Sequence, residues 1–313
     1  MKTLIEARAT ELAYYSPYYF LRQLSAATQQ ELYGTGAAMR WSQVSGAQIH
    51  SNIGGPKSIH WLLQHLQWDS TYFETPVFRL FTGLFDDTAS DADLAKAAAA
   101  LGPQLAAQNG AFYAYSVVPA EDVKLLQGLT AGGWRLVETR LTYYRDKLAA
   151  FDYERFPVRA AKAAEGVLVG QIAASARNPY DRFHADAWFG EVCADAYLAR
   201  YGENTVTTKL ASTVLVPDSV ELPIDSFLAI SDLVSDSSAL GKQLSRVLLT
   251  AVGAQNRGWH VKLMAETLHR AKDLGHEAVL MTTQATNHAV FRSCEKLGFH
   301  LGSTSHVLAY HAS

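Results

Sequence analysis

Apolar runs separated by polar turns predict that strands and helices alternate along the chain. The stretch from Glu277 to Thr283 (EAVLMTT) is nearly continuous in apolar residues and has the length of a strand covered on both faces. Asn287 follows where a side chain can cap a helix, and Gly298 lies where a left-handed residue can end one. The pattern therefore predicts a strand, a short helix and a further strand.

A second apolar run, from Ser245 to Val252, predicts a buried strand that leads into a longer helix. Gly253 breaks the strand, and residues 255–258 (QNRG) form a polar loop. The helix is predicted from about Trp259 to Leu274 by its apolar stripe. The members of this stripe are Leu263, Leu268, Ala271 and Leu274.

The first half of the chain has a similar order of elements. An alanine-rich helix is predicted from Asp91 to Gln108, followed by a strand over 111–118 (AFYAYSVV), a helix, a glycine pair and an aromatic strand. We interpret this repetition as a duplication, with domains 1–150 and 151–313 meeting near Phe151. Only the second half keeps a loop typical of ligand binding.

Composition restricts the class of protein. The 313 residues are 49% hydrophobic and 18% charged, which indicates a globular chain. The net charge of −3 comes from interspersed charges, so a nucleic-acid partner is disfavoured. Cys193 and Cys294 are too few for a disulfide framework, and no run approaches the roughly 20 apolar residues that span a membrane.

The expected setting follows from the start of the sequence and from the cysteines. The start (MKTLIEARATELAYYSPYYF) lacks the apolar core of a signal peptide, so we expect a cytoplasmic protein. No cluster of His, Cys or Asp has the spacing of metal ligands, and no metal is expected. The oligomeric state stays open, with a homodimer as one option.

The loop after the second predicted strand has two interpretations. Free backbone N–H groups at the start of a helix, together with Arg257, predict a site for a phosphate group. The alternative is an ordinary connection with a solvated arginine, since a single glycine is weak evidence. The loop alone does not decide between them.

The loop and the closing segment together resemble the acyl-CoA-binding core of the GNAT N-acyltransferase superfamily. Gln255, Arg257 and Gly258 match the family's Gln/Arg-x-x-Gly-x-Gly/Ala loop, while Asn287 and residues 295–299 (EKLGF) match its second segment. The resemblance implies an α/β fold with a mixed, mostly antiparallel sheet, splayed central strands and flanking helices. It also implies acetyl-CoA as co-substrate and acetyl transfer to a primary amine of a small molecule.

The resemblance also implies where acetyl-CoA binds. The pantetheine arm would lie along the strand edge, the loop would hold the pyrophosphate, and a backbone N–H on the same strand would polarise the thioester carbonyl. The implied cofactor-binding residues are Ala251, Val252, Gln255, Asn256, Arg257, Gly258, Trp259, His260 and Asn287.

Three further segments resemble one group within the superfamily. LQWDSTYF, GGWRLVETRLTYY and NPYDRFHAD look like segments of the TDP-fucosamine acetyltransferase group, which acetylates a nucleotide-linked amino sugar. Members of that group join a truncated GNAT-like N-terminal domain to a complete C-terminal one. Residues before about Leu62 match no segment of the group.

Two residues depart from the superfamily pattern. His260 stands where the loop usually has Gly or Ala. We favour an imidazole that faces outward or toward a phosphate; the alternative is an imidazole that narrows the site. Cys294 stands where many members place a tyrosine that protonates the departing CoA thiolate. A thiol can donate that proton, but a small buried residue that fills the helix face is the alternative.

The general base is less clearly indicated. His184 and Asp186 in RFHAD, and Asp232 after SFLAIS, are candidates to take the proton of the acceptor ammonium. Each has a structural alternative: a turn cap for Asp232, an ion pair for Asp186 and a hydrogen-bonded imidazole for His184. A GNAT-fold scaffold whose loop is plugged by His260 is the competing hypothesis for function.

Overall fold

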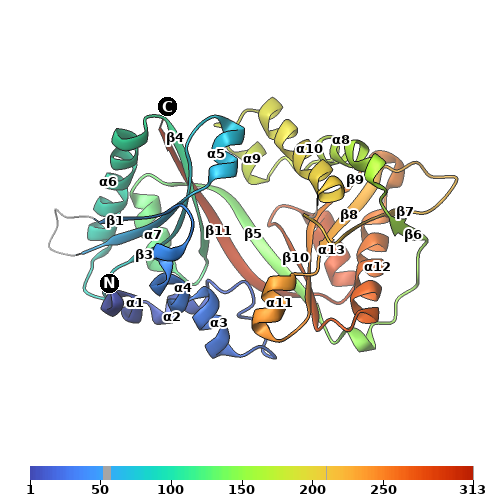
Figure 1. Cartoon of the computed structure of the whole chain (residues 1–313), viewed down its shortest axis with the longest axis horizontal. Helices are drawn as coiled ribbons and strands as arrows, with labels where there is room; N and C mark the ends of the chain where they lie inside the picture. The colour runs from blue at the N-terminus through green and yellow to red at the C-terminus, as the bar shows by residue number, and fades with distance from the viewer. Residues whose placement is uncertain (52–57, 209, 313) are drawn as a thin grey trace. The chain divides into compact units, whose positions relative to one another are not determined.

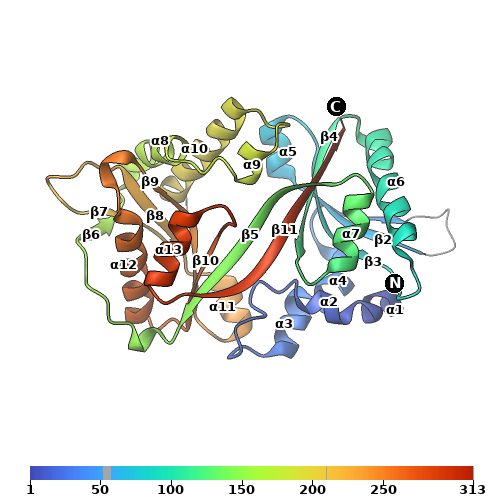
Figure 2. The same cartoon turned by 180° about the vertical axis from the view of Figure 1, so that it is seen from behind.

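The chain of the computed structural model divides into two units (Figures 1 and 2). Unit 1 comprises Met1–Arg140 and Ser303–Ser313, and unit 2 comprises Leu141–Gly302. The structure describes residues 1–51, 58–208 and 210–312. The division falls inside β5 (Arg135–Asp146) and β11 (His300–Ala312), rather than after residue 150, and the end of β11 pairs with β4 of unit 1.

Unit 1 has a sheet in the order β1-β2-β3-β4-β11, in which only the β3–β4 pair is parallel among the described strands. Its other elements, in chain order with the strands, are α1 (Lys2–Ala7), α2 (Ala9–Ala13), α3 (Ala26–Tyr33), α4 (Thr35–Met39), η1 (Trp41–Gln43), β1 (Ala47–Ser51), β2 (His60–His65), α5 (Gln67–Phe73), β3 (Val77–Leu84), α6 (Asp91–Asn109), β4 (Phe112–Pro119) and α7 (Val123–Ala131).

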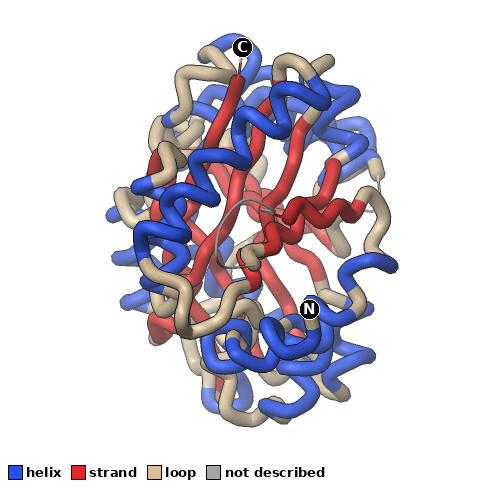
Figure 3. The backbone as a smooth tube through the Cα atoms, turned by 90° about the vertical axis from the view of Figure 1, so that its left-hand side faces the viewer, coloured by secondary structure: helices blue, strands red, loops and turns tan. Residues whose placement is uncertain are grey.

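Helices cover both faces of the unit 1 sheet, and β2 alternates between them. Trp61 and Leu63 pack in a cluster with side chains of α6 and α7. Leu62 points to the opposite face, where it packs with Ile5 of α1 and Leu12 of α2. Figure 3, which faces this unit, shows its strands flanked by helices. This two-sided burial explains the continuous apolar run in β2.

Unit 2 has a sheet in the order β6-β7-β8-β9-β10, in which only the β9–β10 pair is parallel among the described strands. Its elements are η2 (Leu148–Ala150), β6 (Val158–Ala160), η3 (Ala163–Glu165), α8 (Gly166–Ser175), α9 (Arg182–Ala185), α10 (Glu191–Thr207), β7 (Thr213–Pro217), β8 (Ser226–Ser231), α11 (Val234–Leu240), β9 (Leu244–Val252), η4 (Ala254–Asn256), α12 (Trp259–Asp273), β10 (Ala278–Gln284) and α13 (His288–Lys296).

The unit 2 sheet is also buried on both faces. Phe227 and Ala229 of β8 pack on the α8 side, whereas Leu228 and Ile230 pack on the side of α12 and α13. Successive residues of β8 therefore belong to different cores, as the period of a strand requires. The two cores fix the ends of β9 and β10, where the candidate site lies.

The local sequence signals predicted this region well. β9, α12 and β10 match the three predicted elements, Asn287 Oδ1 accepts a hydrogen bond from the Val290 N–H at 3.3 Å, and Gly298 has φ 72°. The predicted apolar stripe of α12 is wrong at one position: Leu274 is 51% exposed. The helix ends at Asp273, so Leu274 has already left the buried face.

The two units repeat one order of elements. β2-β3-α6-β4-α7 in unit 1 has the same sequence of antiparallel and parallel pairings as β8-β9-α12-β10-α13 in unit 2. The described part of the chain contains no helix that is long and apolar enough to cross a membrane. The repeat makes it possible to compare equivalent positions of the two units directly.

Candidate functional site

The parallel strands β9 and β10 part from each other before either strand ends. Their ladder runs from Leu244↔Ala278 to Val247↔Met281, and no later pair joins them in this fully described region. The β8–β9 register shifts at the same place, where Leu248 is the extra residue of a bulge. The later residues of β9 thus present backbone groups that β10 does not use, and we call this point the unit 2 fork.

The loop after β9 is fastened to the segment before β8. The Gly253 N–H donates to the Asp225 carbonyl at 2.6 Å, and the Gln255 N–H donates to Asp225 Oδ2 at 2.8 Å. Asn256 is buried and its amide donates to the Pro223 carbonyl at 3.1 Å and to Ser226 Oγ at 3.0 Å. The buried Asn256 side chain therefore anchors the loop to the segment before β8, whereas Gln255 is exposed.

The start of α12 is uncapped. No side chain caps it, and in this described segment the N–H groups of Trp259, His260 and Val261 have no acceptor. Gly258 precedes them with φ 86°, and a Cβ built there would meet no atom within 4 Å. Arg257 is exposed and has no ion-pair partner among the described residues. Open space, free N–H groups and a free cation are the features of an anion site at a helix start.

His260 does not turn its ring nitrogens to water. Both nitrogens are buried without a hydrogen-bond partner in the described structure. Burial lowers the pKa of His260 to about 4, so the ring is neutral at pH 7. The imidazole therefore does not face outward, and its orientation toward a phosphate stays a prediction. Unpaired buried polar atoms are costly, and a hydrogen-bonding ligand at this helix start would relieve that cost.

The equivalent helix of unit 1 shows what a self-capped start looks like. Ser90 Oγ accepts from the Asp93 N–H at 3.2 Å, and the Ser90 N–H donates to Asp93 Oδ2 at 3.0 Å. Asp91 and Asp93 also place negative charge in the first turn of α6. The start of α6 would repel an anion, whereas that of α12 would attract one.

The remaining residues implied for cofactor binding lie around the unit 2 fork. Ala251 and Val252 are in β9 beyond the ladder with β10, and Asn287 is the N-cap of α13 after β10. The side chain of Trp259 is buried in the α12 core, with Lys262 Nζ 4.8 Å from its ring centroid. Only the backbone of Trp259 is therefore offered to a ligand.

Cys294 is fully buried in the core between α12 and α13. Burial raises the pKa of its thiol to about 12, and the charge of Glu295 adds to the rise. Such a thiol gives up a proton much less readily than an ordinary cysteine. Its surroundings are those of a packing residue.

Asp232 forms a bidentate ion pair with Arg270 of α12. Arg270 Nη1 donates to Oδ1 at 2.7 Å and Nη2 donates to Oδ2 at 2.8 Å. Burial alone would raise the pKa of Asp232, but the hydrogen bonds and charge of Arg270 outweigh it and lower the pKa. A carboxylate held in this way is a poor proton acceptor.

His184 is held between two carboxylates. Its Nδ1 lies 2.7 Å from Asp181 Oδ2 and its Nε2 lies 3.0 Å from Asp195 Oδ1. Asp181 also caps α9 by accepting from the Phe183 and His184 N–H groups. Each ring nitrogen already has a carboxylate partner, which is the arrangement of a structural, hydrogen-bonded imidazole.

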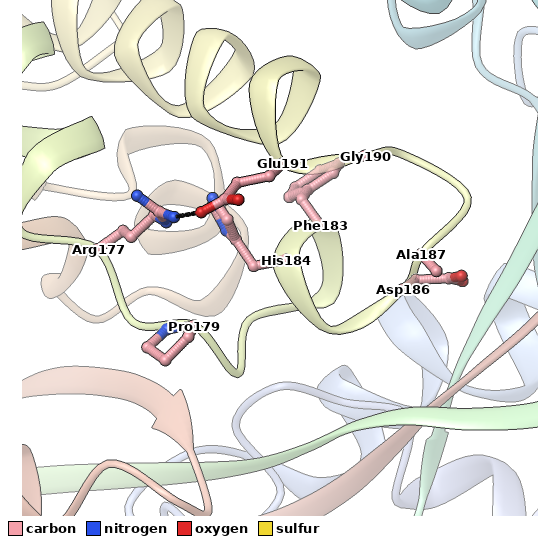
Figure 4. A pocket seen from close by; sticks show the side chains of 8 residues that line it. All are labelled: Arg177, Pro179, Phe183, His184, Asp186, Ala187, Gly190 and Glu191. Carbon is pink, nitrogen blue, oxygen red and sulfur yellow. Dashed lines mark hydrogen bonds and ion pairs between the residues drawn. The ribbon is translucent and has the colours of Figure 1, made fainter.

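A pocket of ≈ 200 Å³ adjoins His184. Figure 4 shows Arg177, His184 and Glu191 close together, with Arg177 paired to Glu191. Asp186 lies at the other end of the pocket (Figure 4). The residues that line it are Arg177, Pro179, Phe183, His184, Asp186, Ala187, Gly190 and Glu191. Asp181 and Asp195 behind His184 add negative charge. Carboxylates outnumber cations here, which favours a positively charged ligand.

One hydrogen bond ties this pocket segment to the unit 2 fork. Asn178, which lies between the pocket residues Arg177 and Pro179, donates from its amide to Gln284 Oε1 at 2.8 Å. Gln284 is the last residue of β10. The pocket therefore belongs to the same side of unit 2 as the parted strands.

The sequence reasoning missed the side chains that hold these parts in place. Asp225, Arg177, Glu191 and Asp195 gave no motif because their partners lie in other elements. NPYDRFHAD was the one signal for the pocket segment. The described residues contain no group of three or more His, Cys, Asp or Glu arranged to hold a metal ion.

Comparisons with known proteins identify the fold. No protein-family model and no curated protein matches the sequence. The structure of a GCN5-related N-acetyltransferase from Sphaerobacter thermophilus is similar, with a TM-score of 0.55 and 11% identity over 98% of this chain and 93% of that chain. A conserved protein of unknown function from Staphylococcus epidermidis gives 0.52 and 9% over 86% and 96%. The predicted GNAT fold, with its mixed sheet and flanking helices, is confirmed.

Proposed function

We propose that the chain is an acetyl-CoA-dependent N-acetyltransferase and that unit 2 binds the co-substrate. The observation that carries the proposal is the coincidence of the parted strands β9 and β10 with an uncapped helix start beside a free arginine. An elongated ligand that ends in phosphates fits this combination, because one part needs strand backbone and the other needs an anion site. Unit 1, a truncated copy in this proposal, keeps a self-capped helix.

The reaction is direct transfer of the acetyl group. The pantetheine arm pairs with β9 at Ala251 and Val252, and the pyrophosphate lies at residues 255–260, with Asn287 facing the arm. The acceptor ammonium first loses one proton to water, and the neutral amine nitrogen then attacks the thioester carbonyl. The C–S bond breaks, and the CoA thiolate that leaves takes up the proton that the nitrogen loses as the amide forms. A backbone N–H at the bulge of β9 stabilises the oxyanion, so positioning supplies most of the rate.

The acceptor in this proposal is a small amine that enters the pocket beside His184. Its excess of carboxylates favours an ammonium group. An amino sugar linked to a nucleotide remains our preferred acceptor, from the resemblance of NPYDRFHAD and two other segments to the TDP-fucosamine acetyltransferase group. The pocket is smaller than a nucleotide sugar, so only the amine-bearing end would enter it.

Calorimetry with acetyl-CoA tests the proposal first. Saturable binding is expected, whereas a degenerate scaffold plugged by His260 would bind none. An amine panel that includes dTDP-linked amino sugars, assayed by CoA release, then identifies the acceptor. Binding without CoA release by any amine would refute the transferase and leave a binding protein.

Arg257→Ala should weaken acetyl-CoA binding by about 3–10-fold and leave the melting temperature unchanged. The side chain is exposed, so its one charge-assisted contact is worth no more than about 1.5 kcal/mol, and added salt should reduce the difference. Arg22→Ala removes an equally exposed arginine from unit 1 and is the matched control. Equal affinity in both variants would contradict a phosphate contact by Arg257.

Cys294→Ala should keep turnover, because the buried thiol packs rather than donates a proton. Cys294→Ser should cost about 1–3 kcal/mol of unfolding free energy by burying a hydroxyl without a partner. Cys294→Tyr should cost a similar amount by overpacking. Steady-state kinetics and thermal melts separate the effects on turnover and on stability. A Cys294→Ala enzyme with normal acetyl-CoA affinity but lost turnover would instead support Cys294 as the acid that protonates the CoA thiolate.

A further inference from the structure

Unit 1 contains the same strand fork as unit 2. Its parallel β3–β4 ladder ends at Leu80↔Ser116, just as the β9–β10 ladder ends at Val247↔Met281. The β2–β3 register shifts at Phe81, the residue directly after the last ladder position, as the β8–β9 register shifts at Leu248. The bulge and the parting of the strands thus coincide in both units, and we call this point the unit 1 fork.

The residues around the two forks correspond one to one. Asp122 lies six residues after Ser116 and is the N-cap of α7, and Asn287 lies six residues after Met281 and is the N-cap of α13. By the same count from the end of the ladder, Thr82 of β3 corresponds to Leu249 of β9. The unit 1 fork therefore has a carboxylate, Asp122, where the unit 2 fork has a neutral amide, Asn287.

The segment that carries α1 and α2 places two side chains across the unit 1 fork: Arg8, between the two helices, and Tyr15, after α2. Arg8 Nη1 donates to Asp122 Oδ1 at 3.0 Å, and Arg8 Nη2 lies 3.5 Å from Thr82 Oγ1. The Tyr15 hydroxyl donates to Asp122 Oδ2 at 2.8 Å, and Thr82 Oγ1 donates to the Tyr15 oxygen at 3.2 Å. These contacts join the strand that ends at Leu84 to the start of α7.

The arrangement is closed to solvent. Arg8, Asp122 and Thr82 are 3%, 0% and 0% exposed, and the Arg8 guanidinium lies 4.2 Å from the centroid of the Phe85 ring. A cation buried this deeply needs a matching carboxylate, and Asp122 supplies it. The unit 2 fork, with Asn287 and Leu249 at the same positions, offers no such partner for a guanidinium.

We propose that the N-terminal segment from α1 to Tyr15 is an internal ligand of the unit 1 fork, in which Arg8 and Tyr15 fill the position that acetyl-CoA takes in unit 2. Residues 1–15, which belong to the part of the chain that no resemblance explains, thereby gain a role: they close the site of unit 1 that corresponds to the unit 2 fork. Only the comparison with acetyl-CoA rests on the proposed function. The occupancy of the fork by a guanidinium group is independent of it.

Chemical rescue tests whether the unit 1 fork is a guanidinium site. Arg8→Ala removes the side chain beyond Cβ, which has the size of ethylguanidinium. The variant should lose hydrogen-exchange protection in peptides of unit 1. Millimolar ethylguanidinium should restore this protection, whereas ethylammonium, which lacks the planar set of N–H donors, should not. Wild type and Arg8→Ala/Asp122→Asn should not respond. Equal responses of all three proteins, or no response of Arg8→Ala, would overturn the proposal.

Binding stoichiometry gives a second test that does not depend on the folding of an Arg8 variant. Wild type should bind one acetyl-CoA per chain, and Gly258→Val, which alters the unit 2 loop, should weaken that single site by about 100-fold or more. Two sites in wild type, one of which Gly258→Val leaves at its wild-type affinity, would show that the unit 1 fork is open and would refute the plug. No binding by wild type would instead refute the proposed function, and the rescue experiment would still decide about the plug.

Discussion

Replacing Gly258 with valine is expected to weaken acetyl-CoA binding by about 100-fold or more, because the side chain would stand in front of the uncapped start of α12. Gly258 has φ 86°, and its Cβ position is open space, so no clash in the free protein opposes the change. A phosphate held by two or more charge-assisted hydrogen bonds at about 1.5–3 kcal/mol each would lose them. Calorimetry with acetyl-CoA measures the loss.

Backbone strain must be separated from this effect. A β-branched residue with positive φ costs about 1–3 kcal/mol, so Gly258→Val should also lower the melting temperature. Gly275, at the other end of α12, has φ 70° and equally open space, and Gly275→Val is therefore the matched control. Both variants should lose similar stability, while only Gly258→Val should lose affinity. Equal affinity for acetyl-CoA in the two variants would contradict the assignment of residues 255–260 as a phosphate-binding loop.

The fold was predictable where the determining signals are local. The runs that became β9 and β10, the cap at Asn287 and the left-handed Gly298 all act within a few residues, and each is found as predicted. The parting of the strands was implied by the resemblance, and the ladder that stops at Val247 shows it. Local propensity and pattern therefore sufficed to place the loop at the end of a strand.

The chemistry of single side chains was not predictable in the same way. Asp232 looked available after a strand, but its partner Arg270 lies on another element, and only the fold brings them together. The same holds for His184, whose second carboxylate comes from α10. Burial also depends on the fold: Cys294 packs in a cluster with side chains of other elements, and both ring nitrogens of His260 are buried. A titratable group in a motif thus says little about its basicity until its neighbours are known.

Asp122→Ala is expected to lower the unfolding free energy of unit 1 by about 3–5 kcal/mol, because it leaves the buried Arg8 guanidinium without a counter-charge. Tyr15 would lose its acceptor in the same step. Since the chain has two units, one global melting temperature would mix their contributions. Hydrogen exchange followed by mass spectrometry resolves them: protection should fall in peptides of unit 1 and be retained in α12 and β10 of unit 2.

A double variant separates the loss of charge pairing from the loss of packing. Arg8→Met/Asp122→Leu replaces both charges with apolar side chains of similar volume, and such replacements of buried pairs are often neutral or stabilising. The double variant should therefore recover most of the protection that Asp122→Ala loses, although it cannot bind a guanidinium. If it were as unstable as Asp122→Ala, the hydrogen bonds of Thr82 and Tyr15, rather than the balance of charge, would hold the N-terminal helices in the unit 1 fork.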